Sequence, residues 1–141
     1  MADAIQNSFK AKIMNGSLDL DTDTIKAMLL TSSHSQNVDT HDFIDDVSTN
    51  EVSGTGYTAG GQALANKSVT QDNTDNEGVW DADDVTWSSS TITARYVALY
   101  KDTGTPSTSP IICILDFGTD KSSSAGNFTV AWNAEGILNL N

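Results

Sequence analysis

Residues 91–101 read Thr-Ile-Thr-Ala-Arg-Tyr-Val-Ala-Leu-Tyr-Lys, the clearest strand pattern in the chain. Alternate residues of a strand point to opposite faces of a sheet. One face would carry Ile92, Ala94, Tyr96, Ala98 and Tyr100, and the other Thr93, Arg95, Val97 and Leu99. Because both faces are largely apolar toward the end of this stretch, we predict that it lies in the centre of a sheet.

The segments on either side also favour strands. Residues 111–117 form a second solid apolar run, which predicts another central strand. In residues 9–13, Phe9, Ala11 and Ile13 alternate with lysines, which predicts a half-buried strand followed by a hairpin turn at Asn15-Gly16. Further strands are expected at residues 18–20, 25–31, 62–71, 79–87 and 128–132, with residues 136–138 closing the chain.

Two segments depart from this pattern. Residues 42–47 predict a short helix, capped by Thr40 or Asp39, with Phe43, Ile44 and Val47 on one face. Residues 48–61 are rich in Gly, Ser and Thr and predict a long loop of the kind that binds partners or moves.

Short strands separated by turn signals predict an all-β, antiparallel fold. A β-sandwich and a barrel both fit, a jelly roll is among the forms that fit, and we expect long loops and at most one short helix. The length of 141 residues predicts a single β domain over residues 1–141. Residues 1–8 are small and polar, and we expect them to form a flexible N-terminal segment that becomes ordered against a neighbouring subunit.

The charge of the chain disfavours two classes of partner. Nineteen acidic residues against seven basic ones give a net charge of −12. Such a chain is repelled by nucleic-acid phosphates and by anionic membrane surfaces, so we expect neither partner. The first residues lack the basic and apolar regions of a signal peptide, which predicts synthesis in the cytoplasm.

No pattern in the sequence predicts catalysis, a cofactor or a metal ion. The lone Cys113 lies in an aliphatic run and is expected in the core, whereas His34 and His41 are expected on an exposed loop. The acidic clusters at residues 19–23 and 81–84 lack the pattern of an EF-hand, although Ca²⁺ binding stays open as an alternative to a solvated surface. Residues 54–59 match a dinucleotide fingerprint only formally, because neither a strand nor a helix flanks them.

Aromatic residues offer one candidate contact. Most of them lie in the predicted strands, where alternation with aliphatic residues favours core packing. Tyr57 instead lies in the glycine-rich loop, and it is the residue that we predict to contact a partner.

Several stretches together resemble a known group of proteins. They are His-Asp-Phe-Ile-Asp-Asp-Val at 41–47, Asn-Glu-Val-Ser-Gly-Thr-Gly-Tyr-Thr-Ala-Gly-Gly at 50–61, Asp-Ala-Asp-Asp-Val-Thr-Trp at 81–87, Thr-Ile-Thr-Ala-Arg-Tyr at 91–96, Tyr-Lys-Asp-Thr-Gly at 100–104, Ser-Pro-Ile at 109–111 and Asp-Phe-Gly at 116–118. The order and the residue sequences of these stretches resemble those of small proteins encoded among the structural genes of tailed bacteriophages and prophages. The resemblance covers about residues 25–138.

The resemblance implies a non-enzymatic structural protein of the virion. Its sharpest form is a capsid decoration, or cement, protein that stabilises the head lattice, with the phage major capsid protein or copies of itself as partners. A homo-oligomer, and in particular a trimer, is then expected. The alternative is a tail, neck-adaptor or fibre-associated module, which could contact host glycans through Tyr57 or the tryptophans. A hydrolase is a third, weaker alternative.

Overall fold

The computed structural model describes residues 3–141 as three antiparallel sheets around two apolar cores. The largest sheet has five strands in the order β1 (Ala4–Ile5), β8 (Ile111–Ser122), β7 (Thr93–Lys101), β2 (Ile25–Leu30) and β3 (Gln62–Ala63). The two strands predicted to be central, β7 and β8, are indeed neighbours inside this sheet. β2 confirms the strand expected at residues 25–31.

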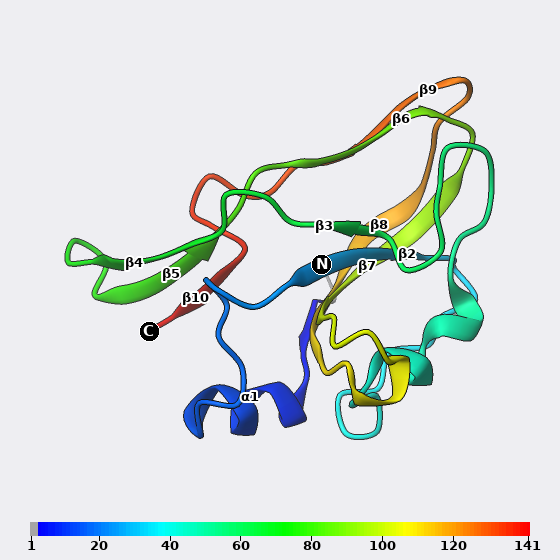
Figure 1. Cartoon of the computed structure of the whole chain (residues 1–141). Coiled ribbons are helices and arrows are strands. Elements are labelled where there is room, and N and C mark those ends of the chain that lie inside the picture. Colours follow the sequence, from blue (N-terminus) through cyan, green and yellow to red (C-terminus); the bar gives the residue numbers. More distant parts are fainter. Residues whose placement is uncertain (1–2) are drawn as a thin grey trace.

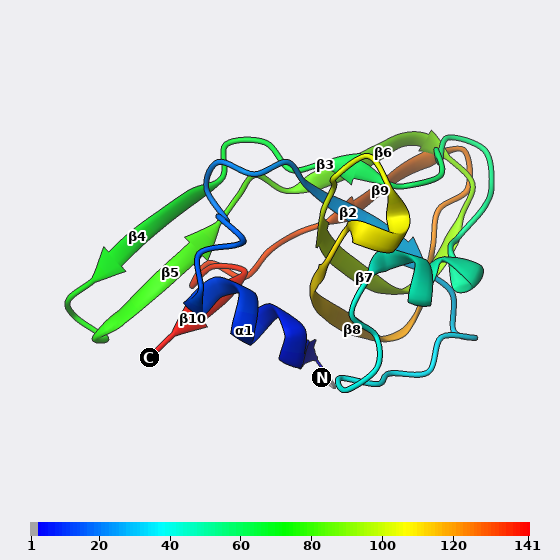
Figure 2. The same cartoon turned by 60° about the horizontal axis from the view of Figure 1, so that its bottom comes forward.

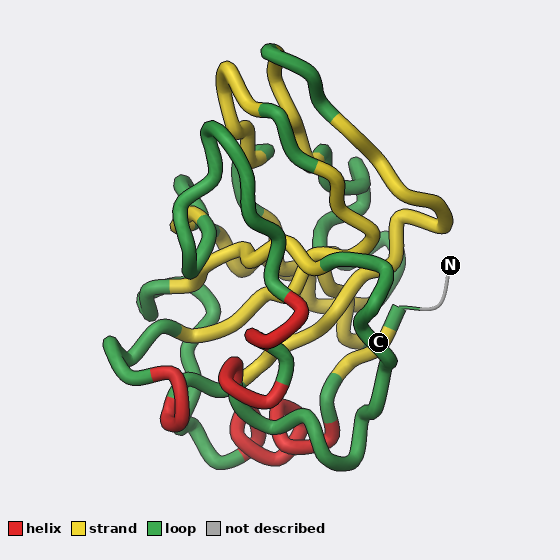
Figure 3. Tube along the Cα trace, turned by 90° about the vertical axis from the view of Figure 1, so that its right-hand side faces the viewer, coloured by secondary structure: helices red, strands yellow, loops and turns green. Residues whose placement is uncertain are grey.

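Each face of the five-stranded sheet is covered, which explains why its central strands are apolar on both sides. One face packs Ala27, Leu29, Val97, Leu99 and Cys113 into the larger core. The other face carries Met28, Leu30, Ala98, Tyr100, Ile111 and Ile114, which pack with Ile44 and Val47. In residues 3–141 the helical segments are α1 (Asn7–Met14) and three short 3₁₀ helices, Ile44–Asp46, Ser48–Asn50 and Pro106–Thr108. Figure 3 shows the helical segments gathered at one end of the molecule.

Two smaller sheets extend from this body. β6 (Val85–Ser90) pairs with β9 (Gly126–Val130), and their Trp87 and Phe128 belong to the larger core. A three-stranded sheet has the order β10 (Leu138–Leu140), β5 (Glu77–Asp81) and β4 (Ser68–Asp72). In Figure 1 the β4–β5 hairpin projects from the body, and in Figure 2 helix α1 lies beside β10.

Helix α1 (Asn7–Met14) corrects the strand predicted at residues 9–13. Phe9 and Ile13 are four residues apart and share one face of a helix, whereas Ala11 is exposed. Asn15-Gly16 reverses the chain as predicted, but as the end of this helix: Gly16 has a positive φ of 75° and Ser17 N–H donates to Lys12 O.

Other predicted elements have shifted bounds. Leu18 and Leu20 are buried, but they lie in the loop between α1 and β2 and not in a strand. The strand expected over residues 62–71 is divided into β3 and β4. Within it Leu64 is buried and the two flanking alanines are exposed, the reverse of the predicted face.

The helix predicted at residues 42–47 is shorter than expected. It is one 3₁₀ turn, Ile44–Asp46, that follows Phe43. Neither Thr40 nor Asp39 caps it. The Asp46 carboxylate instead accepts hydrogen bonds from the backbone N–H groups of Asp42 and Phe43, both at 2.9 Å.

The fold class is confirmed: the chain is mostly β, its sheets are antiparallel, and it has one short α-helix. The sheets are open, so the barrel alternative is not formed. No helix in residues 3–141 is long and apolar enough to cross a membrane.

From Asp3 onward the N-terminal segment contacts the rest of the chain, and the flexibility predicted for residues 1–8 stays a prediction. Residues 1 and 2 lie outside the described part. Ala4 pairs with Ile114 in β8, Asp116 N–H donates to the Asp3 carboxylate at 3.0 Å, and Gln6 is fully buried. These contacts join the segment to the chain's own central sheet.

Candidate functional site

Tyr57, the predicted partner contact, is half-buried and has its hydroxyl group engaged inside the chain. The hydroxyl accepts from Leu29 N–H at 3.0 Å and donates to Glu51 Oε1 at 2.8 Å. The ring stacks on Trp87 with 5.8 Å between centroids, and burial raises the pKa of the hydroxyl. Because Glu51 also accepts from Gly60 N–H, the glycine-rich loop is fastened to the sheet and Tyr57 serves as an internal support.

The two histidines lie together, which corrects the prediction that they are exposed on a loop. Only 4% of His34 is exposed, and its ring lies 5.4 Å from that of His41. His34 Nε2 is 3.0 Å from Gln36 Oε1, and the Gln36 amide donates in turn to Ile114 O. Burial lowers the pKa of His34 and the nearby His41 adds to this effect, while the hydrogen bond to Gln36 opposes it.

This burial predicts a loss of stability at mildly acidic pH. The unfolded chain binds a proton at His34 near the ordinary pKa of about 6.5, whereas the folded chain binds it only at lower pH. The contribution of His34 is therefore complete above pH 6.5 and declines as the pH falls below it. Urea denaturation between pH 5 and pH 8 should show a steeper decline for the native chain than for His34→Gln, which does not titrate. Equal slopes for the two proteins would contradict the prediction.

Carboxylates in the acidic clusters accept hydrogen bonds from backbone N–H groups of the chain. Asp19 accepts from the N–H groups of Asp21 and Thr22, and these backbone hydrogen bonds lower its pKa. Asp84 accepts from Trp132 N–H at 2.9 Å. Within residues 3–141, no group of three or more His, Cys, Asp or Glu side chains is arranged to hold a metal ion.

Cys113 is buried in the core as predicted, with 1% of it exposed. Burial raises the pKa of its thiol to about 12, and the charge of Asp3 acts in the same direction. A thiol with this pKa is protonated at neutral pH and is a poor nucleophile.

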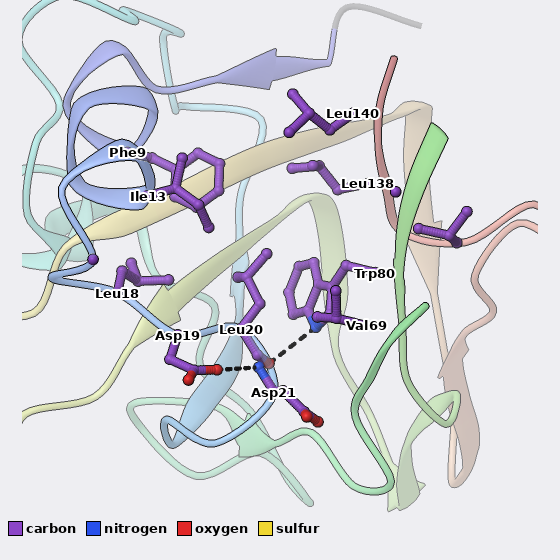
Figure 4. Close-up of a pocket in the computed structure, with 13 residues that line it drawn as sticks. Phe9, Ile13, Leu18, Asp19, Leu20, Asp21, Val69, Trp80, Leu138 and Leu140 are labelled. Atoms are coloured by element: carbon purple, nitrogen blue, oxygen red, sulfur yellow. Dashed lines mark hydrogen bonds between the residues drawn. The ribbon is translucent and has the colours of Figure 1, made fainter. Parts of the chain in front are cut away.

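A groove between α1 and the three-stranded sheet is the candidate functional site (Figure 4). Its volume is about 510 Å³, within the range of ligand-binding pockets. The residues that line it are mainly apolar and come from four parts of the chain: Phe9, Ile13, Gly16, Leu18, Asp19, Leu20, Asp21, Val69, Gly78, Val79, Trp80, Leu138 and Leu140. We call this site the groove.

Strand pairing explains why one side of the groove is apolar. Val69 and Leu138 both pair with Trp80, so the three side chains lie on the same face of the sheet. Gly78, two residues from Trp80 on β5, pairs with Leu140 on that face. The Trp80 indole N–H donates to Leu20 O at 3.1 Å and so connects the sheet to the segment that follows α1 (Figure 4).

Exposed apolar side chains contribute to the groove. Of the four large apolar residues that are exposed in residues 3–141, Val69 and Leu140, which are 53% and 72% exposed, line the groove, and the other two lie outside it. An exposed apolar surface of this kind on a polar chain is typical of an interaction site.

The middle of the groove is open because one of its strand positions has no side chain. A Cβ atom added to Gly78 would meet no heavy atom within 4 Å. Glycine is unfavourable inside a strand unless a turn, a bulge or a close neighbour requires it. β5 runs here in unbroken register with β4, so Gly78 leaves room above the strand without bending it.

The groove lining is acidic where it is charged. It includes Asp19 and Asp21, both exposed, and no basic side chain. Elsewhere, three of the seven basic residues form ion pairs within the chain, Lys26 with Asp102, Arg95 with Asp116 and Lys101 with Asp23. The groove therefore presents an apolar surface beside negative charge.

Sequence patterns alone did not reveal this site. Val69 fits a predicted inward-facing strand position, and Leu18 and Leu20 fit a short strand, yet their shared surface exists only after the chain folds. A groove with this lining suits binding by apolar contact. Comparison of the chain with protein-family models, with curated proteins and with solved structures finds no match.

Proposed function

We propose that the chain is a non-enzymatic structural protein of a tailed-phage virion, and that it decorates the capsid. The sequence resemblance over about residues 25–138 points to the virion. The observation that carries the proposal is the groove, where exposed apolar side chains gather on a chain with a net charge of −12. Burying them against a permanent partner would be favourable by about 25 cal/mol for each Å² removed from water.

A capsid lattice is a partner that suits this surface. A small protein that bridges neighbouring coat subunits adds interface to each of them, and it stabilises the assembled state because it binds that state preferentially. The fastened glycine-rich loop and the two-sided packing of the central sheet give a rigid body for such a contact. This reasoning favours attachment after the coat has assembled.

Copy number tests the proposal. Quantitative mass spectrometry of purified particles should find between about one copy per three coat subunits and one copy per coat subunit. The purified chain should also bind assembled capsids that lack it, and not free coat subunits. A ratio of a few per cent would contradict decoration and indicate the neck, the tail or a fibre instead.

A further inference from the structure

The shape of the groove indicates that its partner inserts large apolar side chains. The groove lies between Phe9 and Ile13 of α1 and the sheet residues Trp80, Leu138 and Leu140 (Figure 4). Val69, Gly78 and Leu140 also line an adjoining hollow of about 520 Å³ along the β4–β5 hairpin, so the surface continues outside the groove. A compact ligand that fills the groove alone would leave this hollow open, whereas a protein segment can cover both.

The charge at the groove indicates what accompanies those apolar side chains. Asp19 stays ionised at neutral pH, because its backbone hydrogen bonds lower its pKa, and Asp21 lies beside it at the exposed rim. Lys or Arg side chains on the partner would meet these carboxylates. Complementary charge of this kind speeds association and orients the partner.

A second copy of the chain fits this site poorly. It would bring its own net charge of −12, and its groove lining has no basic residue to place against Asp19 and Asp21. Like charges placed together oppose association. The occupant is therefore a different chain.

We propose that the groove binds a segment of another protein that inserts large apolar side chains over Gly78 and carries flanking Lys or Arg residues toward Asp19 and Asp21. This deepens the proposed function, because it names the chemistry of the partner at the same groove. On an assembled capsid, such a segment would belong to the coat protein. The chemistry of the segment can nevertheless be tested without any capsid.

A synthetic peptide in which lysine alternates with leucine and phenylalanine is the first probe. Two further peptides serve as controls, one with serine in place of the apolar residues and one with glutamate in place of lysine. In ¹H–¹⁵N NMR titrations of the whole chain, the first peptide should shift the amide signals of β5, β10 and residues 18–21. Both controls should bind at least about tenfold more weakly, which corresponds to about 1.4 kcal/mol.

Two variants with a matched control test the location. Val69→Asp places a charge on the groove face of β4, whereas Thr70→Asp places the same charge on the opposite face of the same exposed strand. An added carboxylate attracts lysine in both variants, so weaker binding by Val69→Asp alone identifies the apolar contact. A Cβ atom at Gly78 would meet nothing within 4 Å and valine suits a strand, so Gly78→Val should fold at least as stably, occupy part of the groove and still lose the peptide.

The outcomes separate this inference from the proposed function. Equal binding of the lysine–serine peptide, equal loss in Val69→Asp and Thr70→Asp, or unchanged binding by Gly78→Val would each overturn the inference. So would a dimer in analytical ultracentrifugation that Val69→Asp abolishes, because the occupant would then be a second copy. If wild-type chain and Gly78→Val bind capsids equally, decoration stands and the groove inference fails. If the peptide binds the groove but copy number is a few per cent, the groove inference stands and decoration fails.

Discussion

Replacing Gly61 with alanine is expected to lower the free energy of unfolding by about 3 kcal/mol or more. Gly61 has a φ of +77°, and a Cβ atom there would lie 1.8 Å from Ala27 O and 2.6 Å from the Ala27 carbonyl carbon. Both atoms belong to the backbone of β2, inside the five-stranded sheet, and cannot move aside as a flexible side chain would. The substitution must therefore push β3 and the preceding loop away from the sheet.

Gly16→Ala provides the matched control for this prediction. Gly16 has nearly the same φ, +75°, but a Cβ atom there would meet nothing within 4 Å. In Gly16→Ala the free energy of unfolding should fall only by the cost of holding alanine in the left-handed conformation, about 1–2 kcal/mol. Urea denaturation of both variants would measure the difference. Equal losses would show that conformation, and not the close approach to β2, makes Gly61 necessary.

Trp80→Ala is expected to cost about 3–5 kcal/mol and to loosen the three-stranded sheet. Trp80 is only 2% exposed, its indole N–H donates to Leu20 O, and its own carbonyl accepts from Ile137 N–H. The side chain thus connects β5 to the segment after α1 at the base of the groove. Truncation leaves a large cavity and removes this connection, so opening of the sheet becomes less costly.

Hydrogen exchange would locate this effect, and urea denaturation would measure its size. The amides of β4, β5 and β10 should lose protection in Trp80→Ala more than the amides of β7 and β8. Trp80→Phe keeps most of the apolar volume and loses the bond to Leu20 O, so it should cost far less than the alanine variant and leave the groove in place. A uniform loss of protection in Trp80→Ala would show that the three-stranded sheet does not open separately.

The central sheet could be predicted from the sequence because its strands are apolar on both faces. β7 and β8 fall within one or two residues of the expected starts, since burial on both faces leaves a pattern that few other structures produce. β8 nevertheless continues to Ser122, five residues beyond the apolar run at residues 111–117. That extension, Gly118–Ser122, is polar and is a strand because it pairs with β7. Pairing of this kind leaves no hydrophobic periodicity in the sequence from which it could be predicted.

The ends of the chain were harder to predict, and the groove depends on them. Phe9 and Ile13 fit a period of two and a period of four equally well, so a short segment cannot distinguish strand from helix. The helix α1 is favoured over a strand because Phe9 packs into the core, and this contact is formed only in the folded chain. The groove joins this misassigned helix to Val69, Trp80 and Leu140, and no local pattern links residues so far apart.

The pairing of β1 with β8 determines when the protein can fold. Ala4 is synthesised 110 residues before its partner Ile114. At a synthesis rate of about 5–20 residues per second, β1 remains without its pairing strand β8 for several seconds or longer. The five-stranded sheet is therefore completed only after β8 has been translated, and until then β1 lacks the strand with which it pairs.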